Sequence, residues 1–238
     1  MYEAYERSAE VYDLLYGQFV DYDANAERIC ELIFQRNERA STLLEVACGT
    51  GAYLERLAEH FQATGLDLSP AMLAAARRRL PETEFYKADM ADFDLGATFD
   101  VVACLFSSIG YIQTLEDLHS TIACVARHLA PGGVAIVEPW HSPDKWQDGR
   151  VDVMSAHNEE MAVARVSTSR RDGRRVTLTW GFTVARADGR VDAFIEEHLT
   201  GQFTVDEHLD AFTAAGLTAD YDPEGLMGRG LYVATRAG

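Results

Sequence analysis

Residues Glu45-Val46-Ala47-Cys48-Gly49-Thr50-Gly51 carry the clearest structural signal in this 238-residue chain. The apolar run that begins at Thr42 leads into them, and a helical pattern from Tyr53 to Ala58 follows. This order predicts a strand, a tight glycine turn and a helix. Ligands of open α/β sheets bind at the carboxyl ends of the strands, where glycine lets the backbone approach the ligand closely. We therefore expect an α/β fold with a ligand beside Gly49 and Gly51.

Residues after the next two strands indicate which ligand this is. Dinucleotide binding would require G-x-G-x-x-G, but Leu54 stands at the third glycine position, which disfavours NAD and FAD. Asp67 lies in a predicted strand over 63–68, where a carboxylate can accept hydrogen bonds from both ribose hydroxyls of an adenosine cofactor. Asp89 and Met90 follow the strand 84–88 and suit the adenine amino group and ring. The spacing therefore favours an adenosine cofactor.

The rest of the chain predicts a doubly wound, mostly parallel α/β sheet with an inserted antiparallel β subdomain. Up to Pro139, strands alternate with helices, which implies parallel pairing with right-handed crossovers. Three β-rich segments joined by Asp-Gly turns follow, and the alternation then resumes. We expect one domain, 1–238, made of a helical cap (1–39), a cofactor-binding core (40–140), the insertion (141–203) and a helix and strands that complete the sheet (204–238).

Charge and composition exclude several classes of protein. The 38 acidic and 21 basic residues give a net charge of −17, which repels phosphate backbones and anionic membranes, so we expect no nucleic-acid and no membrane partner. The first residues lack a signal-peptide pattern, which favours a cytoplasmic protein. The four cysteines show no C-x-x-C pair and are expected to be buried, reduced thiols, and the histidines show no metal-ligand spacing.

Several motifs resemble those of known families. In order, E-V-A-C-G-T-G, G-L-D-L-S, A-D-M-A-D-F and L-A-P-G-G-V resemble the motifs of class I S-adenosylmethionine-dependent methyltransferases, which implies a seven-stranded sheet and that cofactor. The segments Y-D-L-L-Y (12–16), L-F-S-S-I-G-Y (105–111), V-E-P-W (137–140), A-R-V-S (164–167), A-F-T-A-A-G-L (211–217) and G-R-G-L (228–231) are similar to the N-methyltransferases of nucleotide-linked deoxyaminosugars in antibiotic biosynthesis. This narrower resemblance implies a dTDP-linked aminosugar substrate and a homodimer.

The cofactor-binding candidates combine the glycine turn, the acids and nearby apolar and aromatic residues. Tyrosines near the start of the chain suit a sulfonium, which is attracted to the face of an aromatic ring. The predicted cofactor-binding residues are Tyr12, Tyr22, Ala47, Cys48, Gly49, Gly51, Asp67, Leu68, Met72, Asp89, Met90, Leu105 and Phe106.

Tyr111 is the catalytic candidate, because it follows the fourth strand and should lie between cofactor and substrate. Some relatives carry histidine at this place, and a phenol with an ordinary pKa near 10 is a poor base at neutral pH. We therefore expect Tyr111 to orient the substrate amine rather than to abstract a proton.

The other substrate-binding candidates include cations for a diphosphate. Arg229, between two glycines, is the first choice and Arg165 the second, whereas Arg170, Arg171, Arg174 and Arg175 are expected to form a solvated turn. The predicted substrate-binding residues are Tyr5, Ser107, Tyr111, Glu138, Trp140, Arg165 and Arg229.

Two other functions stay open at this point. A small-molecule O-methyltransferase of secondary metabolism would need the same cofactor site, but a hydroxyl needs more help than an amine to lose its proton. The lack of an evident base or metal site therefore favours nitrogen. A non-catalytic scaffold that binds the cofactor is the third interpretation, which the glycine turn and the two acids disfavour.

Overall fold

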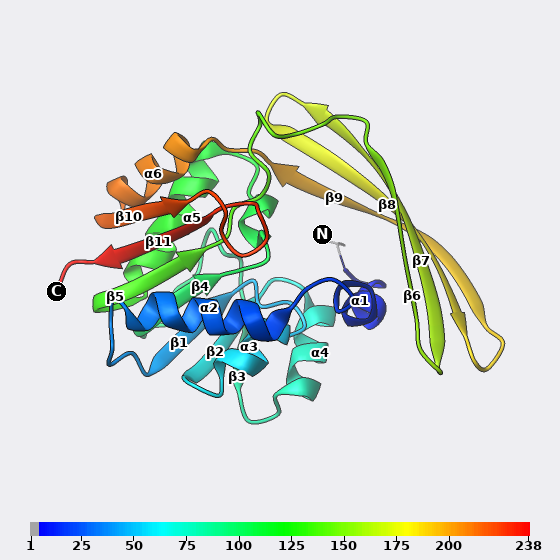
Figure 1. Cartoon of the computed structure of the whole chain (residues 1–238), viewed down its shortest axis with the longest axis horizontal. Helices are drawn as coiled ribbons and strands as arrows, with labels where there is room; N and C mark the ends of the chain where they lie inside the picture. The colour runs from blue at the N-terminus through cyan, green and yellow to red at the C-terminus, as the bar shows by residue number, and fades with distance from the viewer. Residues whose placement is uncertain (1–4) are drawn as a thin grey trace.

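The computed structural model describes residues 5–238, which form two β-sheets with helices packed around one of them (Figure 1). The larger sheet has seven strands in the order β10-β11-β5-β4-β1-β2-β3. Among them only β11 runs in the direction opposite to the other six. Its strands are β1 (Thr42–Val46), β2 (Gln62–Asp67), β3 (Glu84–Lys87), β4 (Phe99–Cys104), β5 (Leu129–Val137), β10 (Leu217–Asp222) and β11 (Leu231–Arg236). The predicted fold class is confirmed.

Helices cover both faces of this sheet because neighbouring strand residues point to opposite sides. Leu43 packs with α2 (Tyr22–Phe34) and α3 (Ala52–Leu57), whereas Leu44 packs with α5 (Leu115–Arg127) and α6 (Val205–Ala214). Both residues are fully buried. The continuous apolar runs of β1, β4 and β5 therefore fill two cores, one on each side of the sheet.

Helix starts are set by the side chains that the sequence indicated. Ser69 accepts a hydrogen bond from the backbone N–H of Met72, and Pro70 opens α4 (Pro70–Arg79). Thr204 and Glu207, three positions apart in the sequence, form a capping box at the start of α6. These local caps direct two of the helices back along the sheet.

The smaller sheet is antiparallel, in the order β6-β7-β8-β9, and lies beside the carboxyl ends of the larger sheet (Figure 1). It consists of β6 (Val151–His157), β7 (Met161–Asp172), β8 (Arg175–Arg186) and β9 (Val191–Gly201). Its inner face packs Trp180 and Phe182 against Val11 and Leu15 of α1 (Ala9–Tyr16). The helix α1 thus lies between the two sheets.

Two features add detail to the sequence-based expectation. The predicted helical cap contains two helices, because Gly17 ends α1 and Asp21 caps α2. The edge strand β6 was not predicted, and β10 was expected only as one of the strands within 204–238. The residues of both edge strands mix polar and apolar types, and both are fixed by pairing with β7 and β11.

Two other properties of the described chain bear on its class. The four cysteines are buried and free, as predicted. None of the helices formed by residues 5–238 has the length and apolar character that crossing a membrane requires.

Candidate active site

A cavity of about 400 Å³ opens at the carboxyl ends of β1, β2 and β4, beneath the N-terminal helix. This volume lies within the range of small-molecule sites. Tyr5 and Tyr111 line it, together with all the predicted cofactor-binding residues except Gly51: Tyr12, Tyr22, Ala47, Cys48, Gly49, Asp67, Leu68, Met72, Asp89, Met90, Leu105 and Phe106. The structure therefore gathers at one place side chains that are spread over more than a hundred positions of the sequence.

The glycine turn and Asp67 form one hydrogen-bonded unit. Gly49 and Gly51 have φ of 56° and 77°, a conformation that favours glycine. The carboxylate of Asp67 accepts hydrogen bonds from the backbone N–H of Gly49 and of Ser69, both at 2.8 Å. Burial raises the pKa of Asp67, and these bonds partly oppose that effect. Gly51 packs against Ala76 of α4 instead of facing the cavity, so its part is to turn the chain into α3.

Glu45 lines the cavity but was not among the predicted site residues. It is buried, and its Oε2 has no hydrogen-bond partner within residues 5–238. Burial, and then the nearby Asp67, raise the pKa of Glu45 well above its ordinary value. A buried carboxyl oxygen without a partner favours a ligand that brings a donor or a positive charge. The ammonium group of S-adenosylmethionine fits this requirement.

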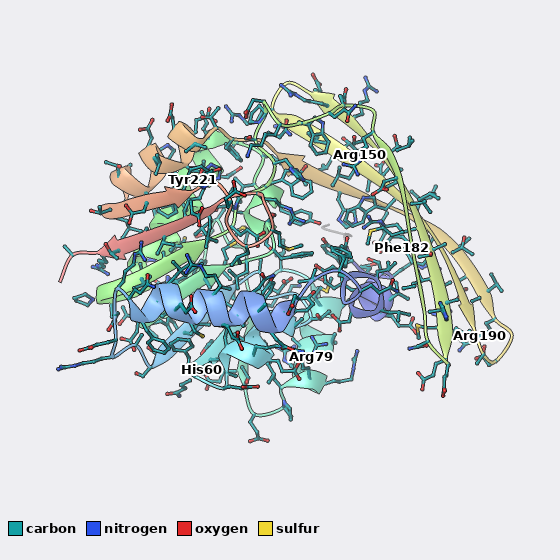
Figure 2. All side chains as sticks on the ribbon, in the orientation of Figure 1. His60, Arg79, Arg150, Phe182, Arg190 and Tyr221 are labelled. Atoms are coloured by element: carbon teal, nitrogen blue, oxygen red, sulfur yellow. The ribbon has the colours of Figure 1, made fainter. Side chains whose placement is uncertain are left out.

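The helix α1 is tied to the glycine turn by Asp13. Its carboxylate accepts a hydrogen bond from the Thr50 hydroxyl at 2.6 Å and forms an ion pair with Arg79 at 2.7 Å. Arg79, labelled in Figure 2, also donates to the Thr50 carbonyl at 2.8 Å. These contacts fix α1 against the glycine turn, and Tyr12 of this helix lines the cavity. Sequence reasoning missed them because they join segments far apart in the chain.

Tyr111 also lines the cavity and ends the short 3-10 helix η1 (Ser108–Tyr111). Phe106 and Ser107, just before it, both have positive φ, which is uncommon for residues with side chains. The Phe106 N–H donates to Glu138 at 2.7 Å, and the Ser107 hydroxyl donates to the Pro139 carbonyl at 2.7 Å. The Tyr111 hydroxyl contacts that of Tyr5. The strained turn thus aims Tyr111 at the cavity.

Four of the predicted substrate-binding residues meet beside this turn. Arg229 donates to the Ser107 hydroxyl at 3.0 Å and lies 3.7 Å from the carboxylate of Glu138. Its guanidinium is 5.8 Å from the ring centroid of Trp140 and 5.3 Å from that of Phe106. Burial raises the pKa of Glu138, and the Arg229 charge opposes this. Phe106 lines the cavity and also contacts Arg229.

Arg165 projects from β7 into the space between α1 and the antiparallel sheet. It is buried, donates to the Tyr16 hydroxyl at 2.6 Å, and lies 4.6 Å from the ring centroid of Trp180. Its Nε has no hydrogen-bond partner in the described part of the chain. Both Arg165 and Arg229 lower the pKa of Tyr16, although burial is the larger effect and leaves that pKa raised. The positive charges of Arg165 and Arg229 therefore both act on the Tyr16 hydroxyl.

The expectation of a solvated arginine turn is wrong for Arg174. This residue donates to the Gln202 carbonyl at 2.8 Å and forms an ion pair with Glu207 at 2.8 Å, which lowers the pKa of Glu207 to about 2. Arg170, Arg171 and Arg175 are exposed, and Arg175 also lines the cavity. Arg174 differs because its side chain reaches the start of α6.

Comparison with known proteins places the chain in a family. A methyltransferase domain model matches residues 43–133. The dTDP-3-amino-3,4,6-trideoxy-alpha-D-glucopyranose N,N-dimethyltransferase of Streptomyces venezuelae is 45% identical over 96% of this chain and 98% of its own length. The dTDP-4-amino-2,3,4,6-tetradeoxy-D-glucose N,N-dimethyltransferase of Saccharopolyspora spinosa is 44% identical over 96% of this chain and 92% of its own.

Solved structures agree with this placement. The crystal structure of Streptomyces venezuelae DesVI matches with a TM-score of 0.92 and 44% identity, covering 96% of this chain and 98% of that one. The S-adenosylmethionine-bound CalS10, an amino pentose methyltransferase from Micromonospora echinaspora, matches with a TM-score of 0.83 and 41% identity, covering 93% and 94%. The chain belongs to the family of S-adenosylmethionine-dependent N,N-dimethyltransferases of dTDP-linked aminosugars.

Proposed function

We propose that this enzyme methylates the amino group of a dTDP-linked deoxyaminosugar in antibiotic biosynthesis, with S-adenosylmethionine as the methyl donor. The observation that carries the proposal is the shared cavity, which Glu45, Asp67 and Tyr111 all line. Family membership supports the same substrate class.

The residues around Asp67 fit the cofactor. S-adenosylmethionine supplies a methyl group on a positively charged sulfur. Asp67 would accept hydrogen bonds from its ribose hydroxyls, Glu45 would meet its ammonium group, and Asp89 and Met90 would meet the adenine amino group and ring. The aromatic rings of Tyr12 and Tyr22 provide faces that attract a sulfonium.

Tyr111 acts on the amine. An uncharged nitrogen attacks in line with the bond that breaks, so position and orientation are the main requirements. The Tyr111 hydroxyl orients the nitrogen by a hydrogen bond. Family membership favours this amine acceptor over the small-molecule O-methyltransferase.

A matched pair of acceptors tests this function. The enzyme is incubated with S-adenosylmethionine and either a dTDP-linked aminosugar or the same sugar with a hydroxyl in place of the amine. We expect mass spectrometry to detect methylated product with the amine only. Methylation of the hydroxyl sugar would favour the O-methyltransferase, and tight cofactor binding without any product would favour the scaffold.

Arg229 is proposed to bind the diphosphate. The Arg229→Ala variant should bind dTDP more weakly by roughly 1.5–3 kcal/mol, because a charge-assisted hydrogen bond is lost. Isothermal titration calorimetry should find S-adenosylmethionine affinity nearly unchanged. Arg28→Ala, on the exposed face of α2, is the matched control. Unchanged dTDP affinity in Arg229→Ala would point to a different phosphate ligand, with Arg165 the next to test.

We also propose that the enzyme is a homodimer joined through the outer face of the antiparallel sheet. Val153, Val166, Gly181 and Ile195 form one row across all four strands. The three larger side chains of this row are 67%, 59% and 71% exposed, and Val151, Val191 and Leu199 extend the patch. An apolar surface this continuous is typical of a protein interface, and a flat sheet face can pack against its own copy.

Ile195→Glu should break this dimer, because each copy would place an unpaired charge in the apolar contact. We expect sedimentation velocity to show a dimer for the natural protein and a monomer for Ile195→Glu. Ile195→Val, which keeps the surface apolar, should remain dimeric. A natural protein that sediments as a monomer, or an Ile195→Glu dimer, would remove this face from the interface.

A further inference from the structure

A chain of buried polar groups leads away from the cavity behind Tyr111. The Tyr111 hydroxyl lies 2.9 Å from Nδ1 of His198, and Nε2 of His198 lies 3.6 Å from the carboxylate of Glu196. His198 and Glu196 both belong to β9, where His198 is fully buried and Glu196 is 7% exposed. A buried histidine between a phenol at the site and a carboxylate has the arrangement of a proton acceptor held by an acid.

Glu196 is held rigidly in its ionised form. Its Oε1 accepts hydrogen bonds from the backbone N–H of Arg7 at 3.0 Å and of Ser8 at 3.1 Å, and its Oε2 accepts from the Ser8 hydroxyl at 2.6 Å. Burial alone would raise the pKa of Glu196, but the facing His198 and these hydrogen bonds hold it below its ordinary value. The carboxylate therefore stays charged. Besides these hydrogen bonds, its contact within the described residues is with His198.

This carboxylate favours one tautomer of His198. Nε2 lies 3.6 Å from the Glu196 carboxylate and makes no hydrogen bond within the described residues, so the negative charge favours the proton on Nε2. Nδ1 is then an acceptor for the Tyr111 hydroxyl. Burial, assisted by the charge of Arg165, lowers the pKa of His198 although Glu196 opposes this, so the ring is neutral. When the Tyr111 hydroxyl donates to His198, the Tyr111 oxygen is free to accept a hydrogen bond from another group. Tyr5 contacts it in this structure, and the substrate nitrogen would donate to it in the complex.

The reaction itself requires such an acceptor. The lone pair of the substrate nitrogen forms the new N–C bond, and the C–S bond breaks with its electron pair passing to sulfur. The nitrogen is left as an ammonium, which has no lone pair and must lose one proton before it can accept a second methyl group. Because Tyr111 lines the cavity and contacts His198, that proton has a route through the protein.

We propose that His198 receives this proton by way of the Tyr111 hydroxyl, and that Glu196 positions His198 for the transfer. The ammonium N–H gives its proton to the Tyr111 oxygen while the Tyr111 proton passes to Nδ1 of His198, so Tyr111 is neutral before and after. The imidazolium is stabilised by the Glu196 carboxylate and returns its proton to water when the product leaves. This inference rests on the proposed function, and it gives Tyr111 a second task beside orientation.

The His198→Asn variant tests the proposal, because asparagine can still accept a hydrogen bond from Tyr111 but cannot take its proton. We expect kcat for dimethylation to fall by about 100-fold, with monomethylated sugar accumulating, as for loss of a general base. KM for the sugar and the Kd of S-adenosylmethionine should stay within about twofold of the natural enzyme. His60→Asn, on the α/β side of the molecule away from the antiparallel sheet, is the matched control (Figure 2).

Two further readouts separate proton transfer from a structural role. Tyr111→Phe combined with His198→Asn should be no slower than Tyr111→Phe alone, because groups that act in one chain are not additive. The ratio of natural to His198→Asn kcat should shrink only at pH values below the ordinary imidazole pKa of about 6.5, because burial lowers the pKa of His198 and the natural enzyme protonates its own acceptor only there. The charged and titratable groups that face His198 are Glu196, Tyr111, Tyr5 and Arg165, and Asn keeps all of them.

Glu196→Gln supplies a second variant if His198→Asn does not fold. It keeps an acceptor for Ser8 but loses the charge that stabilises the imidazolium, so kcat should fall by about 10-fold with unchanged KM. The proposal is overturned if kcat of either folded variant stays within about twofold of the natural enzyme, or if the double variant shows the product of the two separate losses. Dimethylation by the natural enzyme in the same experiment keeps the proposed function independent of this result.

Discussion

Tyr111→Phe is expected to lose about 100-fold in kcat while it binds S-adenosylmethionine normally, since orientation and proton transfer both depend on the hydroxyl that it lacks. The ring of phenylalanine keeps the packing of η1 against Tyr5 and His198, so the fold should be retained. The measurement is steady-state turnover of a dTDP-linked aminosugar, with the mono- and dimethylated products resolved by chromatography.

Tyr86→Phe is the matched control, because it removes the same hydroxyl from an exposed position on β3. It should turn over at the natural rate. If Tyr111→Phe also kept the natural kcat and sugar affinity, Tyr111 would have no part in catalysis, and the relay through His198 would lose its first member.

Asp67→Ala should weaken S-adenosylmethionine binding by about 3 kcal/mol, or roughly 100-fold in Kd. The substitution removes the carboxylate proposed to accept from the ribose hydroxyls. It also leaves the backbone N–H groups of Gly49 and Ser69 without their acceptor, so the glycine turn is no longer held. Isothermal titration calorimetry measures the affinity directly.

Asp210→Ala, on the exposed face of α6, removes the same charge away from the cavity and should leave the affinity unchanged. S-adenosylmethionine affinity in Asp67→Ala within about threefold of the natural protein would show that the ribose is held elsewhere. The comparison also reports on the glycine turn, since a disordered turn would lower the thermal stability of Asp67→Ala but not of Asp210→Ala.

The cofactor half of the molecule was readable from the sequence because its signals are local. Gly49 and Gly51 mark a turn within one strand-turn-helix unit, and the Ser69 cap and Thr204 capping box each depend on residues three positions apart. Parallel pairing then brings the strand ends together by topology alone. Residues near these ends could therefore be gathered into one predicted site without any knowledge of side-chain contacts.

The substrate half was readable only in part because its contacts join distant segments. Tyr111 meets His198 across 87 positions, and Glu196 meets Ser8 across 188. No periodicity or spacing reports on such pairs. Arg174 was wrongly assigned to solvent for the same reason, because its ion pair joins the turn to Glu207 at the start of α6. Glu45 was passed over because an acid inside an apolar strand gives no sign of which way it faces.

A crystal structure of the enzyme with S-adenosylhomocysteine and a dTDP-linked aminosugar is the most direct test of the proposed site. We expect the sugar nitrogen at hydrogen-bond distance, about 3 Å, from the Tyr111 hydroxyl, with the diphosphate against Arg229 and the adenosine ribose on Asp67. A sugar nitrogen bound away from Tyr111, with the nucleotide outside the space between the two sheets, would contradict it.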